Sequence, residues 1–122
     1  MNLSRINQTK LLYYAAISWT VAIFIGCSMP GDGLPYEVSN RDKLIHIGIF
    51  LIFGFLWRWL GYRVIIVLLS GAIYGFLIEV WQGVMPINRS YDLYDALADT
   101  VGTLLGIGLA DLMKIVISRK SH

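Results

Sequence analysis

Charged residues are scarce in this chain, and their scarcity excludes most classes of water-soluble protein. Only 15% of the 122 residues are Asp, Glu, Lys or Arg, whereas a soluble domain usually carries about 25%. Hydrophobic residues make up 57% of the chain. This composition favours a protein that crosses the membrane several times, and the length favours one domain over residues 1–122.

Cysteine and clustered basic residues are also lacking. Cys27 is the single cysteine, which excludes an internal disulfide and a cysteine-based zinc site. The net charge is only +2, without a basic run that has interleaved aromatics, so we expect no nucleic-acid partner. The Lys and Arg residues instead carry topological information, because they gather at cytoplasmic ends of membrane helices. Near the carboxyl end, Asp111 and Lys114 predict an interfacial ion pair.

Long apolar runs separated by short polar segments predict an all-α bundle of four transmembrane helices. The expected spans are about residues 11–29, 43–60, 64–85 and 93–117, each near the ~20 residues that cross ~30 Å of hydrocarbon. Seven Lys and Arg residues lie at the two ends and around the second connection, and three lie in the other connections. This asymmetry predicts that both termini are cytoplasmic.

Carboxylates inside two of these spans indicate a functional site. The segment 89–106, RSYDLYDALADTVGTLLG, has Asp92, Asp95 and Asp99 at spacings of three and four, so they share one helix face. Asp99 lies about six residues, or ~9 Å, inside the fourth span. Glu79 lies at the same predicted depth in the third span. Ionisable residues at such depth are costly in a bilayer and are therefore functional candidates.

Polar residues from three segments are predicted to converge at the outer level of the membrane. They form the candidate ligand-binding set: Asp42, Lys43, His46, Glu79, Gln82, Arg89, Asp92, Asp95 and Asp99. His46 is a metal ligand, a general base, a proton donor to a phosphate head group, or a structural residue. We expect Arg89 either to form a salt bridge at the outer entrance of the site or to bind an anion through two guanidinium N–H groups. Two carboxylates close together in a low dielectric do not both stay ionised, so we expect a shared proton or a bound divalent ion.

Glycine pairs accompany the acids on the third and fourth spans. Gly71 and Gly75 lie four residues apart, as do Gly102 and Gly106. This spacing lets helix backbones approach closely in lipid. We expect the two pairs to face each other and to bring the acids of the two spans together.

A family resemblance rests on the order and spacing of these polar residues. The pattern is Asp42-Lys43-x-x-His46, then Glu79-x-x-Gln82, then Arg89-x-x-Asp92-x-x-Asp95-x-x-x-Asp99-x-x-Gly102. It resembles the VanZ-like family of small bacterial membrane proteins over nearly the whole chain, although that family usually has Asn at the place of Asp99. The founding member of the family is linked to resistance to the glycopeptide antibiotic teicoplanin. The resemblance implies a multi-pass protein of the bacterial cytoplasmic membrane with a role in the cell envelope.

Three functions are compatible with these features. The first is an outward-facing polar pocket that binds a lipid head group, a lipid-linked wall precursor or a glycopeptide antibiotic. The alternative is an intramembrane enzyme acting on a phospho- or acyl-lipid, with Mg²⁺, Mn²⁺ or Zn²⁺ held by carboxylates and His46. No glycine-rich phosphate loop, HExxH motif or serine elbow occurs in the sequence. The third is proton or ion transport, for which four helices leave little room unless the protein forms a homo-oligomer.

Overall fold

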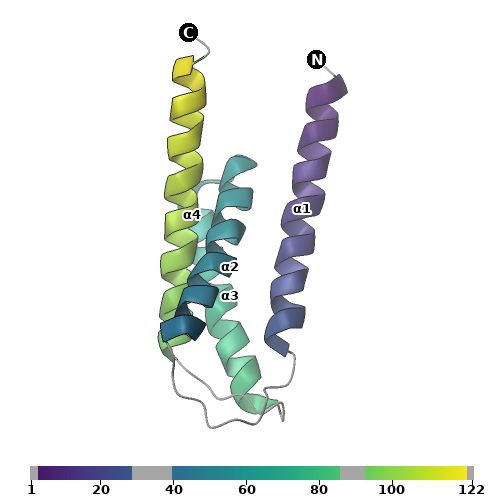
Figure 1. The fold of residues 1–122 in the computed structure, drawn as a ribbon. Helices are drawn as coiled ribbons and strands as arrows, with labels where there is room; N and C mark the ends of the chain where they lie inside the picture. Colours follow the sequence, from purple (N-terminus) through teal and green to yellow (C-terminus); the bar gives the residue numbers. More distant parts are fainter. Residues whose placement is uncertain (1–2, 29–39, 86–92, 121–122) are drawn as a thin grey trace.

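The computed structural model describes residues 3–28, 40–85 and 93–120. Every regular element among these residues is an α-helix, and the four helices are α1 (Leu3–Ser28), α2 (Asn40–Trp59), α3 (Val64–Val84) and α4 (Leu93–Lys120). The prediction of an all-α four-helix bundle is confirmed (Figure 1). The first helix starts at Leu3, well before the predicted span that starts at residue 11.

Three of the helices, α1, α3 and α4, are long and apolar enough to cross a membrane. The fourth, α2, has charged residues near both of its ends, among them Lys43 and Arg58. It packs most extensively against α4, so much of its surface is covered by protein. A membrane crossing by α2 is therefore compatible with its charges, and it stays a prediction.

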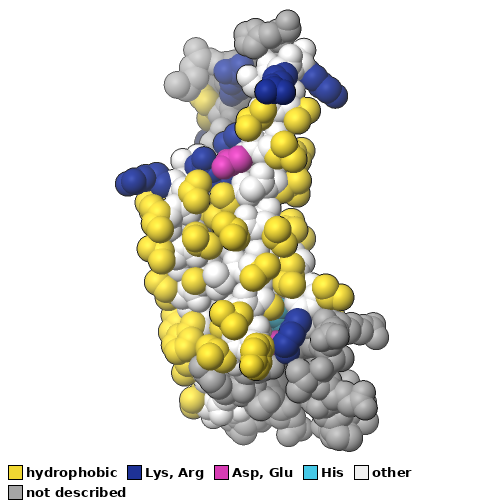
Figure 2. All heavy atoms as spheres, turned by 90° about the vertical axis from the view of Figure 1, so that its left-hand side faces the viewer, with side chains coloured by type: hydrophobic (Ala, Val, Ile, Leu, Met, Phe, Trp, Pro, Cys, Tyr) yellow, Lys and Arg dark blue, Asp and Glu magenta, His cyan; other side chains and the backbone are white. Residues whose placement is uncertain are grey.

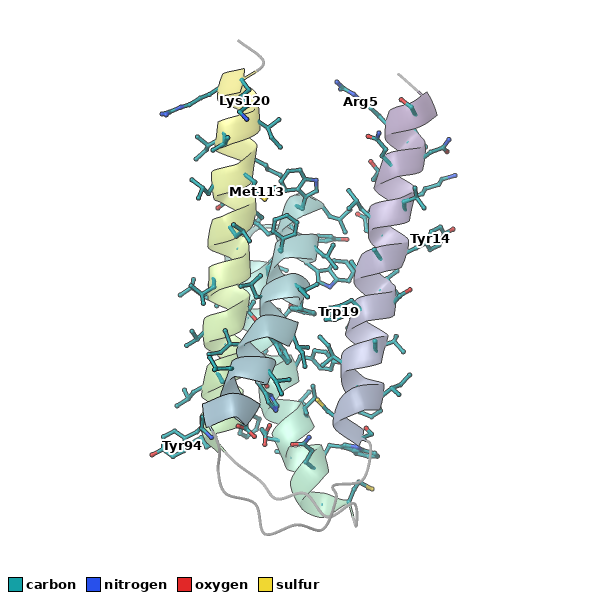
Figure 3. The ribbon with its side chains drawn as sticks, in the orientation of Figure 1. Arg5, Tyr14, Trp19, Tyr94, Met113 and Lys120 are labelled. Carbon is teal, nitrogen blue, oxygen red and sulfur yellow. The ribbon has the colours of Figure 1, made fainter. Side chains whose placement is uncertain are left out.

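The first turn of α1 and the last turn of α4 lie at the same end of the bundle (Figure 1). α1 begins there and α4 finishes there, as the labels Arg5 and Lys120 show, whereas Tyr94 marks the opposite end (Figure 3). On the face in Figure 2, Lys and Arg lie toward both ends of the bundle while apolar side chains cover the middle. This distribution agrees with a bundle that crosses a membrane. That the termini lie on the cytoplasmic side stays a prediction from the positive-inside rule.

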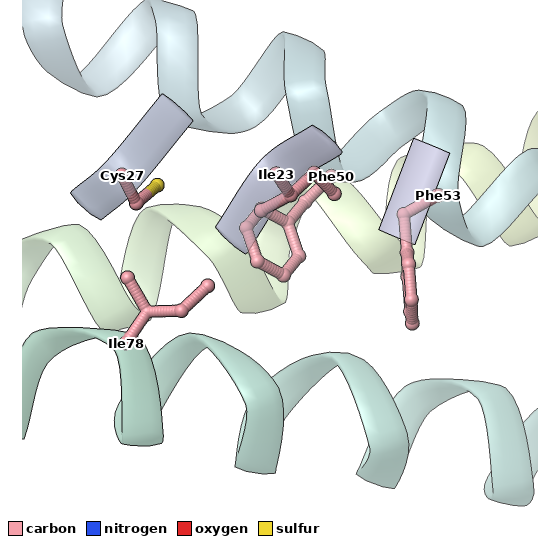
Figure 4. Packing of buried hydrophobic residues seen from close by; sticks show 5 residues of the cluster. All are labelled: Ile23, Cys27, Phe50, Phe53 and Ile78. Atoms are coloured by element: carbon pink, nitrogen blue, oxygen red, sulfur yellow. The ribbon is translucent and has the colours of Figure 1, made fainter. Parts of the chain in front are cut away.

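The apolar core lies between α1, α2 and α3. Its buried cluster consists of Ile23, Cys27, Phe50, Phe53 and Ile78 (Figure 4). Because lipid tails are as apolar as these side chains, their burial drives association in a membrane less than packing and interhelical hydrogen bonds do. Such bonds attach α1 to the bundle, since the indole of Trp19 donates to the carbonyl of Ile49 at 2.9 Å. The indole of Trp57 donates to the hydroxyl of Thr20 at 3.1 Å.

Backbone-to-backbone packing joins α4 to α2. A Cβ atom on Gly102 would lie 2.9 Å from the Cα of Ile47, and one on Gly106 would lie 2.7 Å from the amide nitrogen of Phe55. Neither position has room for a side chain unless the backbone moves. The expectation that this glycine pair faces the third span is therefore wrong, because the pair contacts α2.

The glycines of α3 face polar residues of α4. A Cβ atom on Gly75 would lie 2.7 Å from the Oδ2 of Asp99, and Gly71 lies against the side chain of Thr103. The small residues of α3 thus leave space for two polar side chains. α4 consequently has two contact faces, a glycine face toward α2 and a polar face toward α3.

Candidate functional site

Three polar side chains from three helices meet at the end of the bundle opposite the termini. They are His46 of α2, Glu79 of α3 and Asp99 of α4, and all three are buried. One ligand atom from each lies within 4.8 Å of those from the other two. The Nδ1 atom of His46 lies 2.8 Å from the Oδ1 atom of Asp99, which is a hydrogen bond. We call these three residues the buried triad.

Two further charged residues, Asp95 and Lys43, lie next to the buried triad. The Oδ2 atom of Asp95 lies 3.8 Å from the Nε2 atom of His46, so a carboxylate lies near each nitrogen of the imidazole ring. The Oδ1 atom of Asp95 lies 3.5 Å from the ammonium of Lys43, whose side chain is 24% exposed. Lys43 also lies 5.9 Å from the ring centroid of Tyr94, which is exposed. A chain of charged contacts therefore runs from His46 through Asp95 to the partly exposed Lys43, and we call Lys43 and Asp95 the rim residues.

Helical spacing explains why α4 delivers two acids to one place. Asp95 and Asp99 lie four residues apart and so point from the same face. Thr103 continues that face, is fully buried, and donates its hydroxyl to the carbonyl of Asp99 at 2.8 Å. Thr103 was not among the predicted site residues, although its spacing from Asp99 was a signal that could have identified it. Its packing against Gly71 fixes the height of the polar face of α4 relative to α3.

Gln82 is buried at the same end, but its hydrogen bond is structural. Its amide donates to the backbone carbonyl of Cys27 at 3.0 Å. That carbonyl belongs to the last turn of α1, where carbonyls have no partner within the helix. Gln82 therefore caps α1 and connects it to α3.

Three of the predicted site residues lie wholly or in their side chains outside the described part of the chain. Arg89 and Asp92 lie outside the described residues. Asp42 belongs to α2, but its side chain lies outside the described part of the chain. Their roles in a site stay predictions.

The buried triad and the rim residues together form a polar cluster, and the formal charge of this cluster determines what it can bind. Among the described residues it contains one ammonium, Lys43, and three carboxyl groups, those of Glu79, Asp95 and Asp99. Four other charged residues, two of each sign, are close to it in the sequence: Arg41, Asp42, Arg89 and Asp92. With a neutral imidazole the set therefore has an excess of negative charge. Burying such an excess is unfavourable unless protons or cations neutralise it, so the cluster suits a proton, a cation or a donor-rich head group.

A separate apolar pocket of about 360 Å³ opens between α1, α2 and α3. Its lining includes Thr20, Trp57, Tyr62 and Tyr74, and it includes no residue of the predicted site. Tyr62 lies in the link between α2 and α3, at the end of the bundle where the termini lie. The pocket and the buried triad are thus separate features, and the polar chemistry belongs to the triad.

Nearly the whole chain matches a known family of proteins. The sequence model of the VanZ/LLP1 family matches residues 3–114, a range that contains all four helices except the last turns of α4. No curated protein and no solved structure matches the chain.

Proposed function

Because this chain belongs to the VanZ/LLP1 family of membrane proteins, we propose that it binds an amphipathic envelope molecule at its polar end. By polar end we mean the end of the bundle that contains the buried triad and the rim residues. The candidate ligands are a lipid head group, a lipid-linked wall precursor and a glycopeptide antibiotic, which share a polar head and an apolar tail. The proposed location is the bacterial cytoplasmic membrane, with the polar end outside. Teicoplanin is the glycopeptide that we propose to test.

One observation carries this proposal: the rim residues Lys43 and Asp95 connect the buried triad to the bundle edge. Lys43 supplies a partly exposed ammonium that suits a phosphate or carboxylate. Behind it, Asp95 and the triad supply acceptors for amine or hydroxyl donors. A head group with an anion next to an amine or sugar hydroxyls matches this order of charges. Its apolar tail would lie along exposed apolar residues of α2 and α4, such as Leu44 and Leu97.

Binding to reconstituted protein tests the proposal. Tag-free protein in nanodiscs is titrated with phosphatidylethanolamine, phosphatidylglycerol, an isoprenoid diphosphate carrying a wall sugar, and teicoplanin, and bound ligand is followed by native mass spectrometry. We expect saturable binding of one of these probes and at least a tenfold loss for Lys43→Ala and His46→Gln. Arg58→Ala is the matched control, because Arg58 is on the same helix as Lys43 but at the opposite end.

The arms of this experiment also distinguish the ligand sources. Preference for the isoprenoid probe assigns a wall precursor, preference for a phospholipid assigns a head group, and preference for teicoplanin assigns the antibiotic. Equal binding by wild type, Lys43→Ala and His46→Gln would refute a role for the polar end. Absence of saturable binding by every probe would refute the proposal as a whole.

An intramembrane enzyme is the second candidate function. The observation in its favour is the combination of an imidazole with two carboxyl groups in one buried cluster, because such groups act as general acids and bases and as metal ligands. The proposed substrate is a phospholipid or an acyl-lipid. Incubation of the protein with labelled lipid and Mn²⁺ or Zn²⁺, followed by mass spectrometry, tests it. Product that forms with wild type but not with Glu79→Gln supports catalysis, and equal product from both variants refutes it.

A further inference from the structure

We propose that His46, Glu79 and Asp99 together bind one divalent transition-metal ion, of the Zn²⁺ or Mn²⁺ class. This inference goes beyond head-group binding and catalysis, because it requires neither a lipid nor a reaction. It assigns the carboxyl end of α3 and the amino-terminal third of α4 to one metal centre. The three ligands come from three different helices, so the ion would also hold the polar end of the bundle together.

The separation of the donor atoms suits a single ion. Two ligand atoms bound to one Zn²⁺ ion at about 2.1 Å lie at most about 4.2 Å apart. The donor atoms of the triad all lie within 4.8 Å of one another, and those of His46 and Asp99 are 2.8 Å apart, close to neighbouring positions around an ion. A small rotation of the Glu79 side chain would bring its carboxylate within ligand distance of the ion.

The donor types select the class of ion. Mg²⁺ and Ca²⁺ prefer sites made of oxygen atoms alone, whereas imidazole nitrogen together with carboxylate oxygen suits Zn²⁺ and Mn²⁺. Three protein ligands leave coordination positions open for water or for a further group. Such an open position gives a phosphate or carboxylate head group a direct contact with the ion.

Asp95 supports the imidazole from the side away from the triad. With Nδ1 of His46 turned toward Asp99, the carboxylate of Asp95 is 3.8 Å from Nε2. A carboxylate that accepts from the second ring nitrogen is the usual partner of a metal-bound histidine, because it fixes the ring and raises the basicity of the ligand. Lys43 in turn holds Asp95. Asp95 thus lies near the second ring nitrogen of His46, at a separation longer than a hydrogen bond, and a small shift of the ring toward Asp95 would give His46 this arrangement.

The excess of carboxyl groups in the cluster also favours the binding of a cation. The described cluster contains three carboxyl groups and one ammonium, and the buried triad contains two of the carboxyl groups. A divalent cation neutralises two carboxylates in a low-dielectric setting. A bound ion would therefore add ligand bonds to both of these carboxyl groups.

Metal titration of the purified protein tests the inference. The affinity tag is removed, because oligohistidine binds these ions, and the protein in detergent is stripped with EDTA. Zn²⁺ or Mn²⁺ is then added in equilibrium dialysis, and bound metal is measured by mass spectrometry. We expect one ion per chain for wild type, at least a tenfold weaker affinity for Glu79→Gln and Asp99→Asn, and a loss of about tenfold for Asp95→Asn.

The control is Asp111→Asn, which makes the same chemical change on the same helix at the opposite end of the bundle. We expect its affinity to stay within twofold of wild type. Substitution with Co²⁺ adds a readout that does not depend on stability, because ligation by His46 changes the visible absorption spectrum. Circular dichroism of each variant without metal shows whether it is folded, and only folded variants are compared.

Two results would overturn the inference: no saturable metal binding by wild type, or wild-type affinity in folded Glu79→Gln and Asp99→Asn. Head-group binding is measured separately in the presence of EDTA, so its failure and the failure of the metal site are distinguishable. Head-group binding that survives EDTA while wild type binds no ion refutes the metal site alone.

Discussion

Two polar pairs join α2 to α4 at opposite ends of the bundle, and they have the same register. His46 and Asp99 are separated by 53 residues, and so are Arg58 and Asp111. Equal separations mean that α2 and α4 run in the same direction. The nitrogen-to-oxygen distances are also nearly equal, 2.8 Å for the first pair and 2.7 Å for the second.

Burial distinguishes the two pairs. The side chain of Asp99 is fully buried, whereas that of Asp111 is 38% exposed and Arg58 also donates to the carbonyl of Tyr62. Exposed ion pairs contribute little because water screens the charges, whereas a buried charge without its partner is strongly unfavourable. The two pairs therefore occupy equivalent positions on α2 and α4, but one is a partly exposed salt bridge and the other is part of the buried candidate site.

The largest expected difference between the two pairs is the loss of stability when the basic partner, His46 or Arg58, is removed. His46→Ala removes the ring from between two carboxyl groups, so we expect a loss of about 3–5 kcal/mol. Arg58→Ala, on the same helix, should cost about 0–1 kcal/mol. Unfolding in mixed detergent micelles, followed by circular dichroism, measures both. Similar losses in the two variants would mean that burial does not distinguish the pairs.

A smaller effect is expected from filling the space that Asp99 occupies. In Gly75→Ala the new methyl group would meet the side chain of Asp99, and overpacking of this kind costs about 1–3 kcal/mol. Gly108→Ala is the control, because a Cβ atom there meets nothing within 4 Å. Equal unfolding midpoints for the two variants would contradict the close packing of α3 on the polar face of α4.

Gln82 tests whether burial at the polar end is enough to make a residue part of the site. Its amide caps a carbonyl of α1, so Gln82→Ala should reduce the free energy of unfolding by about 1 kcal/mol. Metal and head-group affinity should stay within twofold of wild type. A loss of affinity larger than that of stability would place Gln82 in the binding site.

The smallest effect is expected for the coupling between Arg58 and Asp111. A double-mutant cycle with Arg58→Ala and Asp111→Ala should give less than about 1 kcal/mol, and the value should fall as salt is raised. The same cycle for His46 and Asp99 should give a larger coupling that salt changes little. Comparable salt dependence in both cycles would indicate that water reaches the buried pair.

The helices could be predicted from the sequence because long apolar runs with few charges specify membrane helices by length and composition. The matched depth of Glu79 and Asp99 could be predicted as well, since helix rise converts residue number into height. The partner of Asp111 could not be predicted from the sequence. The spacing suggested Lys114, but Asp111 contacts Arg58, and Lys114 lies over the ring of Trp59 at 5.4 Å.

The glycine pairs show the same limit of prediction from sequence, namely that the contacting helix is not identified. Their spacing predicted close helix contact, and Gly102 and Gly106 do make one, but with α2 instead of α3. A periodic pattern specifies which residues share a face of a helix. It contains no information about which neighbouring helix covers that face.

The sequence by itself determined that this chain is a helical membrane protein with acidic residues at one depth, because hydropathy and helical rise act along the chain. The tertiary structure decided which of those residues meet: His46 joins Asp99 and Glu79, while Gln82 holds α1. That choice depends on how α4 is rotated between α2 and α3. The rotation is set by steric fit between glycines and backbone on one side and between Thr103 and Gly71 on the other.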